Sequence, residues 1–443
     1  MGDGAGVVTS TIGTNTVHPV GLVALLFMCM LFMALPRRRA MVVLFLCFSF
    51  VPVGQRFVLM TIDFPFFRIM LFFGMVRVLM RGEFSSYVPN RLDYMMFAWT
   101  IVSTIMFSIS QVGSSPIGKI GSSIDLLNAY FLTRFLVRDL VDVNRLISGL
   151  AMMSAPIMCF FLIEWSTSRN LFGFMGGVPE ITAIRDGKLR CQGAYAHPIL
   201  GGCYWAALLP LFLGRIVSGG KGRLICVVGA FSSLAIIAMC NSSTAALGAL
   251  AGMLGIAAFK IRNGMVVVRW AVVAMAISLH FIMKAPVWHL IARLDFMGGQ
   301  SWHRYHVIDC CIRYVDEWIV AGTPNIDHWQ IYDNDLTNQY ALEGVRGGGL
   351  SLLLYLCAIA VAFGNVGRLH RKVPPPQVML AWSIGVSLFV HTVNFFGVSY
   401  WGQLDSIFTI ALGLTTVAAS PDPRGMESVD SEAYGREIRL AHG

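Results

Sequence analysis

Long hydrophobic stretches recur along nearly the whole chain, separated by short polar or Gly/Pro-containing breaks. An α-helix needs about 20 apolar residues to cross the hydrocarbon core of a bilayer. The stretches approach that length, and they lack the polar–apolar alternation of strands in a membrane barrel. We therefore predict an all-α fold, a polytopic transmembrane helix bundle of about 12 to 13 spans. The predicted spans are 20–35, 41–57, 66–79, 92–110, 124–141, 146–164, 196–213, 224–240, 244–259, 266–283, 348–363, 378–393 and 404–418.

One long polar interval, residues 284–346, separates the tenth predicted span from the eleventh. We predict a large, helical loop outside the cytoplasm here. Polar chemistry concentrated at the mouth of a hydrophobic bundle marks the place where function is expected.

Composition supports a membrane protein. The 443 residues are 56% hydrophobic and only 13% charged, with a mean hydropathy of +0.67. A soluble globular protein has about a quarter of its residues charged, so that class is excluded. The net charge of +9 does not point to nucleic acid, because the basic residues sit mostly in short clusters between spans.

The charge distribution predicts the orientation. Basic clusters at 37–39, 215–223 and 368–372 fall on one side of the bundle, which is cytoplasmic by the positive-inside rule. The interval 286–346 carries eight acidic residues and four arginines but no lysine, so we place it on the outer side. The polar segment 420–443 is predicted to be a poorly ordered cytoplasmic tail. Segment 124–141 has charged residues, so an interfacial amphipathic helix is an alternative there.

The first candidate site precedes the span at 196–213. Arg185, Lys188 and Arg190 place three bases within six residues on the outer side, which is costly without an anionic partner. Arginine suits phosphate because its planar fork donates two hydrogen bonds at once. The alternative is contact with lipid headgroups or a solvated loop. Gln192 is a candidate for substrate binding, and His197, before Pro198, is either a donor or an interfacial residue.

A polar turn at 241–244 separates two spans, and its side chains either cap the following helix or face a substrate cavity. In the long interval, Arg304 is a second candidate anion clamp. His303 and His306 share a helix face, but further ligands at metal-site spacing are missing, so no metal is expected. His306 and His328 are candidates for substrate contact or for structural roles.

The end of the interval holds the candidate base. Asp335 lies just before a span and could accept a proton from a substrate hydroxyl, with Asn338, Gln339 and Tyr340 binding the substrate. Alternatively, Asp335 caps a helix that begins near residue 336. Three glycines at 347–349 permit a tight turn or close helix approach.

Three motifs occur in a characteristic order. They are Arg190-x-Gln192-Gly193-x-x-x-His197-Pro198, the Ser242-Ser243-Thr244 turn, and Asn338-x-Tyr340-x-Leu342-Glu343 at the end of a large loop that carries Arg304 beside aromatic residues. Over residues 176–356 the chain resembles the O-antigen ligase and O-antigen/exopolysaccharide polymerase superfamily of bacterial inner-membrane proteins.

The resemblance implies a metal-independent membrane glycosyltransferase that needs no cofactor. Residues 1–419 would form the transferase domain. It would move a glycan from an undecaprenyl-pyrophosphate donor to a sugar hydroxyl on the periplasmic face, with Arg190 and Arg304 holding the pyrophosphate. Ligases commonly have a histidine, the proposed base, where this chain has Thr337, which favours a polymerase over a ligase. Asp335 is our substitute base, followed by His328 and His306.

The expected partners are the lipid-linked donor, the glycan acceptor, membrane lipids and other polysaccharide assembly proteins, but not nucleic acid. The expected location is the bacterial inner membrane. An alternative function is a transporter or flippase for polysaccharide or lipid-linked sugar. Transporters usually place charged groups or broken helices near the bilayer midplane, often in two repeated halves, whereas the polar groups here cluster in loops. A non-catalytic membrane scaffold is the third possibility.

Overall fold

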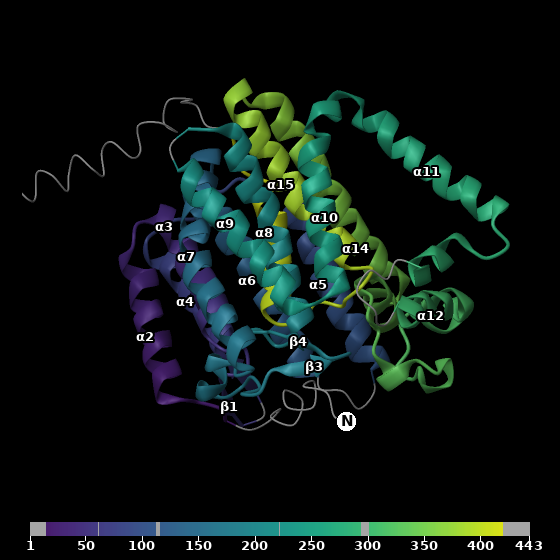
Figure 1. Ribbon diagram of the computed structural model, residues 1–443, viewed down its shortest axis with the longest axis horizontal. Coiled ribbons are helices and arrows are strands. Elements are labelled where there is room, and N and C mark those ends of the chain that lie inside the picture. Colours follow the sequence, from purple (N-terminus) through teal and green to yellow (C-terminus); the bar gives the residue numbers. More distant parts are fainter. Residues whose placement is uncertain (1–14, 61, 112–115, 221, 294–300, 420–443) are drawn as a thin grey trace, which may run out of the picture.

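The computed structural model describes residues 15–60, 62–111, 116–220, 222–293 and 301–419; the predicted tail at 420–443 lies outside them. The chain forms an all-α bundle with two small β-hairpins at one end (Figure 1). The helices are α2 (Pro19–Ala34), α3 (Arg37–Phe50), α4 (Phe66–Met80), α5 (Arg91–Ser110), α6 (Pro116–Leu136), α7 (Leu140–Thr167), α8 (Pro198–Ser218), α9 (Arg223–Cys240), α10 (Ser243–Ala257), α11 (Met265–Ile282), α12 (Ser301–Arg313), α13 (Val315–Trp318), α14 (Gln339–Lys372), α15 (Pro375–Asn394) and α16 (Gln403–Leu414).

Short elements connect these helices. The hairpins pair β1 (Arg56–Leu59) with β2 (Ile62–Pro65) and β3 (Ala183–Arg185) with β4 (Lys188–Arg190), both antiparallel. The 3-10 helices are η1 (Leu171–Met175), η2 (Ala258–Gly264), η3 (Val287–Arg293), η4 (Asp327–Trp329) and η5 (Tyr332–Asn334).

Within the described residues, seven helical segments are long and apolar enough to cross a membrane. They are Arg91–Ser110, Leu140–Thr167, Pro198–Ser218, Arg223–Cys240, Ser243–Ile282, Gln339–Lys372 and Pro375–Asn394. The helices Pro19–Ala34 and Gln403–Leu414 are apolar but shorter. The membrane character predicted from the hydrophobic runs is therefore supported, while the count of 12 to 13 spans stays a prediction.

Two predicted spans have wrong boundaries. The predicted span 41–57 ends early, because α3 stops at Phe50 and the chain turns extended at Val51, the residue before Pro52. The predicted span 124–141 crosses a helix boundary: α6 ends at Leu136, and the Asp139 side chain caps the start of α7.

Helix α6 lies packed within the bundle. It packs against α4, α5 and α16, and Tyr130 and Leu132 are fully buried. Its charged side chains have partners inside the bundle, since Arg68 Nε donates to both carboxylate oxygens of Asp125 at 3.0 and 2.9 Å. Paired charges of this kind explain how a segment with four ionisable residues can lie among packed helices.

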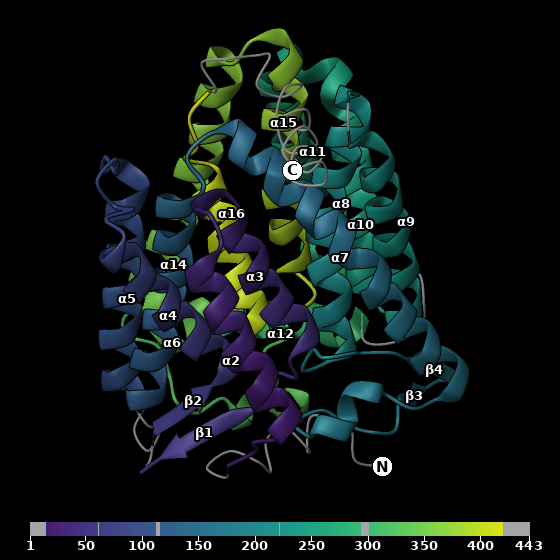
Figure 2. The same ribbon diagram turned by 90° about the vertical axis from the view of Figure 1, so that its left-hand side faces the viewer.

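The two ends of the bundle differ in chemistry. At one end, Arg37 donates to the carbonyl of Leu136 and Arg138 donates to the carbonyl of Glu83, so the basic breaks α2–α3, α4–α5 and α6–α7 meet there. At the other end lie both hairpins and the segment around α12 (Figures 1 and 2). The basic clusters and the candidate site residues thus occupy opposite ends.

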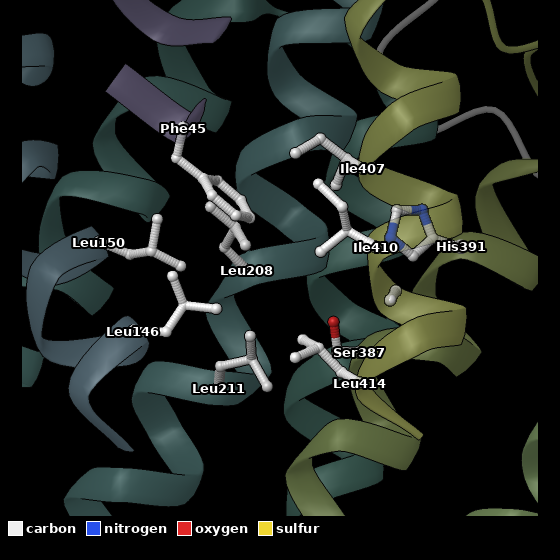
Figure 3. Close-up of a pocket in the computed structure, with 11 residues that line it drawn as sticks. Phe45, Leu146, Leu150, Leu208, Leu211, Ser387, His391, Ile407, Ile410 and Leu414 are labelled. Atoms are coloured by element: carbon white, nitrogen blue, oxygen red, sulfur yellow. The ribbon is translucent and has the colours of Figure 1, made fainter. Parts of the chain in front are cut away.

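Most side chains in the core of the bundle are apolar. A small pocket lies among side chains of α3, α7, α8 and α16, and its polar lining comes from Ser387 and His391 of α15 (Figure 3). His391 is fully buried, and its Nδ1 lies 3.0 Å from the Tyr400 hydroxyl. Helix α11, by contrast, stands apart from the bundle and has no buried residue (Figure 1).

Candidate functional site

The β3–β4 hairpin presents the first basic cluster. Its two-residue turn, Asp186-Gly187, has positive φ angles of 52° and 73°, as hairpin turns with Asp-Gly favour. Arg185 is partly exposed and lies 3.9 Å from the Asp186 carboxylate, and Lys188 is exposed. Arg190 differs from both because only 6% of it is exposed. The hairpin therefore directs one of its three bases inward.

The segment after Arg190 is fixed by hydrogen bonds. The backbone N–H groups of Gln192 and Gly193 donate to the two carboxylate oxygens of Glu164, at 3.0 and 2.9 Å. The Gln192 side-chain amide donates to the carbonyl of Tyr195 at 3.0 Å, so its nitrogen is used within the loop. Residues 191–196 are therefore buried and held in place by specific hydrogen bonds.

His197 is the N-cap of α8. Its Nδ1 accepts a hydrogen bond from the N–H of Ile199 at 3.2 Å, and Pro198 occupies the first helical position. Burial, followed by the positive charges of Arg190 and Arg185, lowers the pKa of His197 to about 3. The imidazole is therefore neutral and acts as a hydrogen-bond acceptor.

The α9–α10 turn joins the two halves of the candidate site. On one side, the N–H of Cys191, next to Arg190, donates to the carbonyl of Met239 at 3.0 Å. On the other side, Arg304 Nη2 donates to Thr244 Oγ1 at 2.9 Å. Arg190 and Arg304, which are 114 positions apart in the sequence, thus border the same turn at the same end of the bundle.

The capping role considered for this turn is not observed. Ser242 is the N-cap of α10, but its side chain makes no capping hydrogen bond. Thr244 lies inside the helix, where its hydroxyl accepts from Arg304 and donates to the carbonyl of Gly397 at 3.3 Å. The turn therefore contributes a hydroxyl to the surroundings of Arg304.

His306 is half-buried and His328 is exposed, and both lie against Trp329 in the small core of the α12 segment. His306 Nε2 lies 3.1 Å from the carbonyl of Trp329. His328 Nε2 lies 2.9 Å from Glu317 Oε1, while Trp329 Nε1 donates to Glu317 Oε2 at 3.0 Å. The hydrogen bond from His328 lowers the pKa of Glu317. Both histidines thus hold the fold of this segment, with Trp329 at its centre.

Asp335 is exposed at the surface before α14. Its backbone carbonyl lies 3.0 Å from His303 Nε2, and its carboxylate is not a helix cap. Partial desolvation raises the pKa of Asp335 above its usual range, although the nearby His303 opposes the shift. A carboxyl with this character can accept a proton from a hydroxyl more readily than an ordinary aspartate.

The helix expected near residue 336 begins at Gln339, and its cap is Asn338, whose Oδ1 accepts from the N–H of Ala341 at 3.0 Å. The Asx residue that caps the helix was therefore predicted three positions too early. Asn338 is buried, and its amide oxygen is committed to the helix.

Gln339 and Tyr340 anchor α14 to the C-terminal helices. Gln339 Oε1 accepts from the N–H of Tyr400 at 2.6 Å, and its Nε2 donates to Glu343 at 3.1 Å. The Tyr340 hydroxyl donates to the carbonyl of Thr392 at 3.0 Å. The polar side chains of Asn338, Gln339 and Tyr340 therefore all have structural partners, whereas the carboxylate of Asp335 is exposed.

Glu164 is the contributor that sequence reasoning missed. Glu164 is the last residue of the predicted span 146–164. A single carboxylate at the end of a long apolar run is the sequence feature that could have marked it as a functional candidate. Among the described residues, no three His, Cys, Asp or Glu side chains are grouped to hold a metal ion.

No model of a known protein family matches the chain, and no curated protein sequence matches it either. Any assignment of function therefore depends on the residues and geometry of this molecule.

Proposed function

We propose that this protein is a membrane glycosyltransferase that moves a glycan from an undecaprenyl-pyrophosphate donor to a sugar hydroxyl on the outer face of the bacterial inner membrane. The reaction would be polymerisation or ligation of a polysaccharide. One observation carries the proposal: Arg190 and Arg304 border the same α9–α10 turn, at the end of the bundle opposite the basic breaks.

The chemistry of the donor explains why two arginines would be needed. Breaking the bond between a sugar and pyrophosphate develops negative charge on the leaving group. Guanidinium groups that are already in place stabilise this charge in the transition state without reorganising. Arg190 would approach from the β4 side and Arg304 from α12.

The acceptor hydroxyl would lose its proton to Asp335. This assignment is favoured by the raised pKa and the exposure of its carboxyl group. It is also favoured by the structural engagement of the other candidates, since His306 and His328 both pack around Trp329. The apolar helices would accommodate the lipid tail of the donor within the bilayer.

The test replaces each arginine and analyses the cell-surface glycan. Arg190→Ala and Arg304→Ala should each abolish polymer formation or transfer, while the protein stays in the membrane at native level. Arg313→Ala is the matched control, because Arg313 is an exposed residue of α12 that pairs with Asp309. Normal glycan in both arginine variants would refute the proposal. In a deletion strain, a single repeat unit on its carrier would indicate a polymerase, and full-length polymer left on lipid would indicate a ligase.

A transporter or flippase is the second candidate, and one feature favours it. Helix α14 is broken at Gly348, where φ is 73° and ψ is 173°, and interrupted helices are common at the binding sites of transporters. Purified protein in liposomes separates the two functions. Movement of a labelled lipid-linked sugar without a new glycosidic bond would favour transport over transfer.

A further inference from the structure

Glu164 is a carboxylate buried in an unusual place. It lies in the last turn of α7, and only 1% of the residue is exposed. Burying a carboxylate costs several kcal/mol unless hydrogen bonds replace its water. A buried acid at the end of an apolar helix therefore needs an explanation in its contacts.

The hydrogen bonds of the Glu164 carboxylate are all made with residues that flank the β3–β4 hairpin. Oε1 accepts from the N–H of Gln192 at 3.0 Å and from the Thr182 hydroxyl at 3.2 Å. Oε2 accepts from the N–H of Gly193 at 2.9 Å. Thr182 directly precedes β3, while Gln192 and Gly193 follow β4. One carboxylate thus ties both ends of the hairpin to α7.

The backbone conformation and the close packing at Gly193 both require glycine. Its φ is +58°, and a Cβ at this position would lie 2.5 Å from the ring of Phe161 on α7. The Asn170 side chain also donates to the carbonyl of Gly193 at 2.8 Å. The loop is therefore held close against α7 and the residues that follow it.

Arg190 lies two residues before Gln192, the first residue whose backbone N–H donates to Glu164. Between them, Cys191 donates its N–H to Met239 on α9. The backbone that carries Arg190 is consequently fastened at α9 by one bond and at α7 by the carboxylate. If the bond to α7 is weakened, the strand can shift, and the guanidinium at its end shifts with it.

We infer that Glu164 is a positioning residue for Arg190, holding the β4 end so that its guanidinium faces a diphosphate group. This inference rests on the proposed function and names a contributor to the same site. Glu164 itself would not touch the substrate, because its oxygens are engaged with the loop.

Substitution by glutamine tests the role with minimal change in size. Glu164→Gln keeps one acceptor oxygen but turns an NH₂ group toward a backbone N–H, so one of the two loop bonds is lost. Thr182→Val is the matched control, since it removes the third hydrogen bond and leaves both backbone bonds in place. Glu164→Asp, which keeps the charge, serves as the second variant if the glutamine protein cannot be purified.

The measurement is the affinity for farnesyl diphosphate, a short lipid diphosphate, of the full-length protein in lipid nanodiscs. We expect Glu164→Gln to weaken binding about tenfold, as the loss of one hydrogen bond to a charged group allows. Thr182→Val should bind within about twofold of the native protein. The loss of affinity caused by Glu164→Gln should be smaller for farnesyl monophosphate than for farnesyl diphosphate.

Double variants separate positioning from general loss of structure. If Glu164 acts through Arg190, the protein with both Glu164→Gln and Arg190→Ala should bind no more weakly than Arg190→Ala alone. With Arg304→Ala, which lies on a different segment, the two fold-losses should multiply. Multiplied losses with Arg190→Ala, or native affinity in Glu164→Gln, would overturn the inference. Native affinity in both Arg190→Ala and Arg304→Ala would instead refute the proposed function.

Discussion

Arg304 reaches from α12 to the first turn of α10, where its Nη2 donates to the Thr244 hydroxyl at 2.9 Å. These two residues are 60 positions apart, and their bond joins the outer segment to the helix bundle. Thr244 in turn donates to the carbonyl of Gly397, just after α15. The Thr244 hydroxyl therefore links α10 to α12 and to the segment after α15, and these contacts fix the position of the Arg304 guanidinium.

Replacement of Thr244 by valine should weaken substrate binding while preserving the fold. Valine matches the shape of threonine but offers Arg304 no acceptor, so we expect a loss of about 1–2 kcal/mol, or roughly 5- to 30-fold in affinity for a lipid diphosphate. Thr244→Ser should retain most of the affinity because it keeps the hydroxyl. Titration of each variant in nanodiscs checks this, and equal affinities of the valine and serine proteins would contradict it.

The pH dependence of transfer should report the environment of Asp335. With Asp335 as the proposed base, transfer would require its ionised form, so activity would be lost as the pH falls through its pKa, which desolvation raises. Asp333→Asn removes a negative charge that raises the pKa, and should move the acidic limb to lower pH. His303→Gln removes a group that lowers the pKa, and should move the limb to higher pH.

Rates of glycan transfer measured across pH test these opposite shifts, with Asp335→Asn as the inactive reference. Shifts in the same direction, or an active Asp335→Asn protein, would eliminate Asp335 as the base. The effect on stability has the opposite sign to that on activity. Because the folded protein binds this proton more tightly than the unfolded chain does, the contribution of Asp335 to stability falls as pH rises through its pKa.

The hydrophobic runs predicted the helices well because burial in a bilayer or a bundle demands long apolar segments. The errors arose where local backbone chemistry decided the outcome. Pro52 ended α3 early, and Asp139 started a new helix inside a predicted span. At α14 two Asx residues could each cap the helix, and the sequence did not show that Asn338, not Asp335, would do so.

The sequence suggested candidate residues for the site but not their arrangement. Arg190 and Arg304 were identified by charge on the expected outer side, whereas their shared position at the α9–α10 turn depends on tertiary packing. Glu164 was hidden because its partners are backbone N–H groups, which no side-chain pattern reveals. Distant contacts of this kind follow from the fold rather than from sequence spacing.

Gly348 should be irreplaceable in α14, unlike a second glycine of the same helix. Its φ is +73°, and an added Cβ would lie 2.8 Å from the carbonyl oxygen of Val320. We expect Gly348→Ala to cost about 1–3 kcal/mol of stability. The control is Gly364→Ala, where a Cβ would meet open space. Thermal unfolding of purified protein tests the difference, and the same midpoint for both variants would show that the break at Gly348 is not needed.

The ion pair between Asp93 and Arg134 should contribute strongly to the fold at the basic end. Arg134 Nε donates to Asp93 Oδ1 at 3.0 Å, and the side chains are only 10% and 2% exposed. Asp93 also accepts from the Tyr130 hydroxyl at 2.7 Å and completes the capping box of α5. Asp93→Asn leaves the guanidinium buried without a counter-charge, so we expect a loss of about 3–5 kcal/mol.

The matched control for this prediction is the pair Arg313–Asp309, which has the same chemistry but an exposed arginine. Asp309→Asn should cost less than about 1 kcal/mol, because water screens the charge of the exposed Arg313 and an asparagine oxygen can still accept from Trp288 Nε1. Thermal unfolding and the amount of folded protein recovered from membranes measure both changes. Replacing Asp93 and Arg134 together by Asn and Leu should cost less than Asp93→Asn alone, since no unpaired charge is left. If the double variant were instead the less stable, the penalty would come from lost packing rather than from a stranded charge.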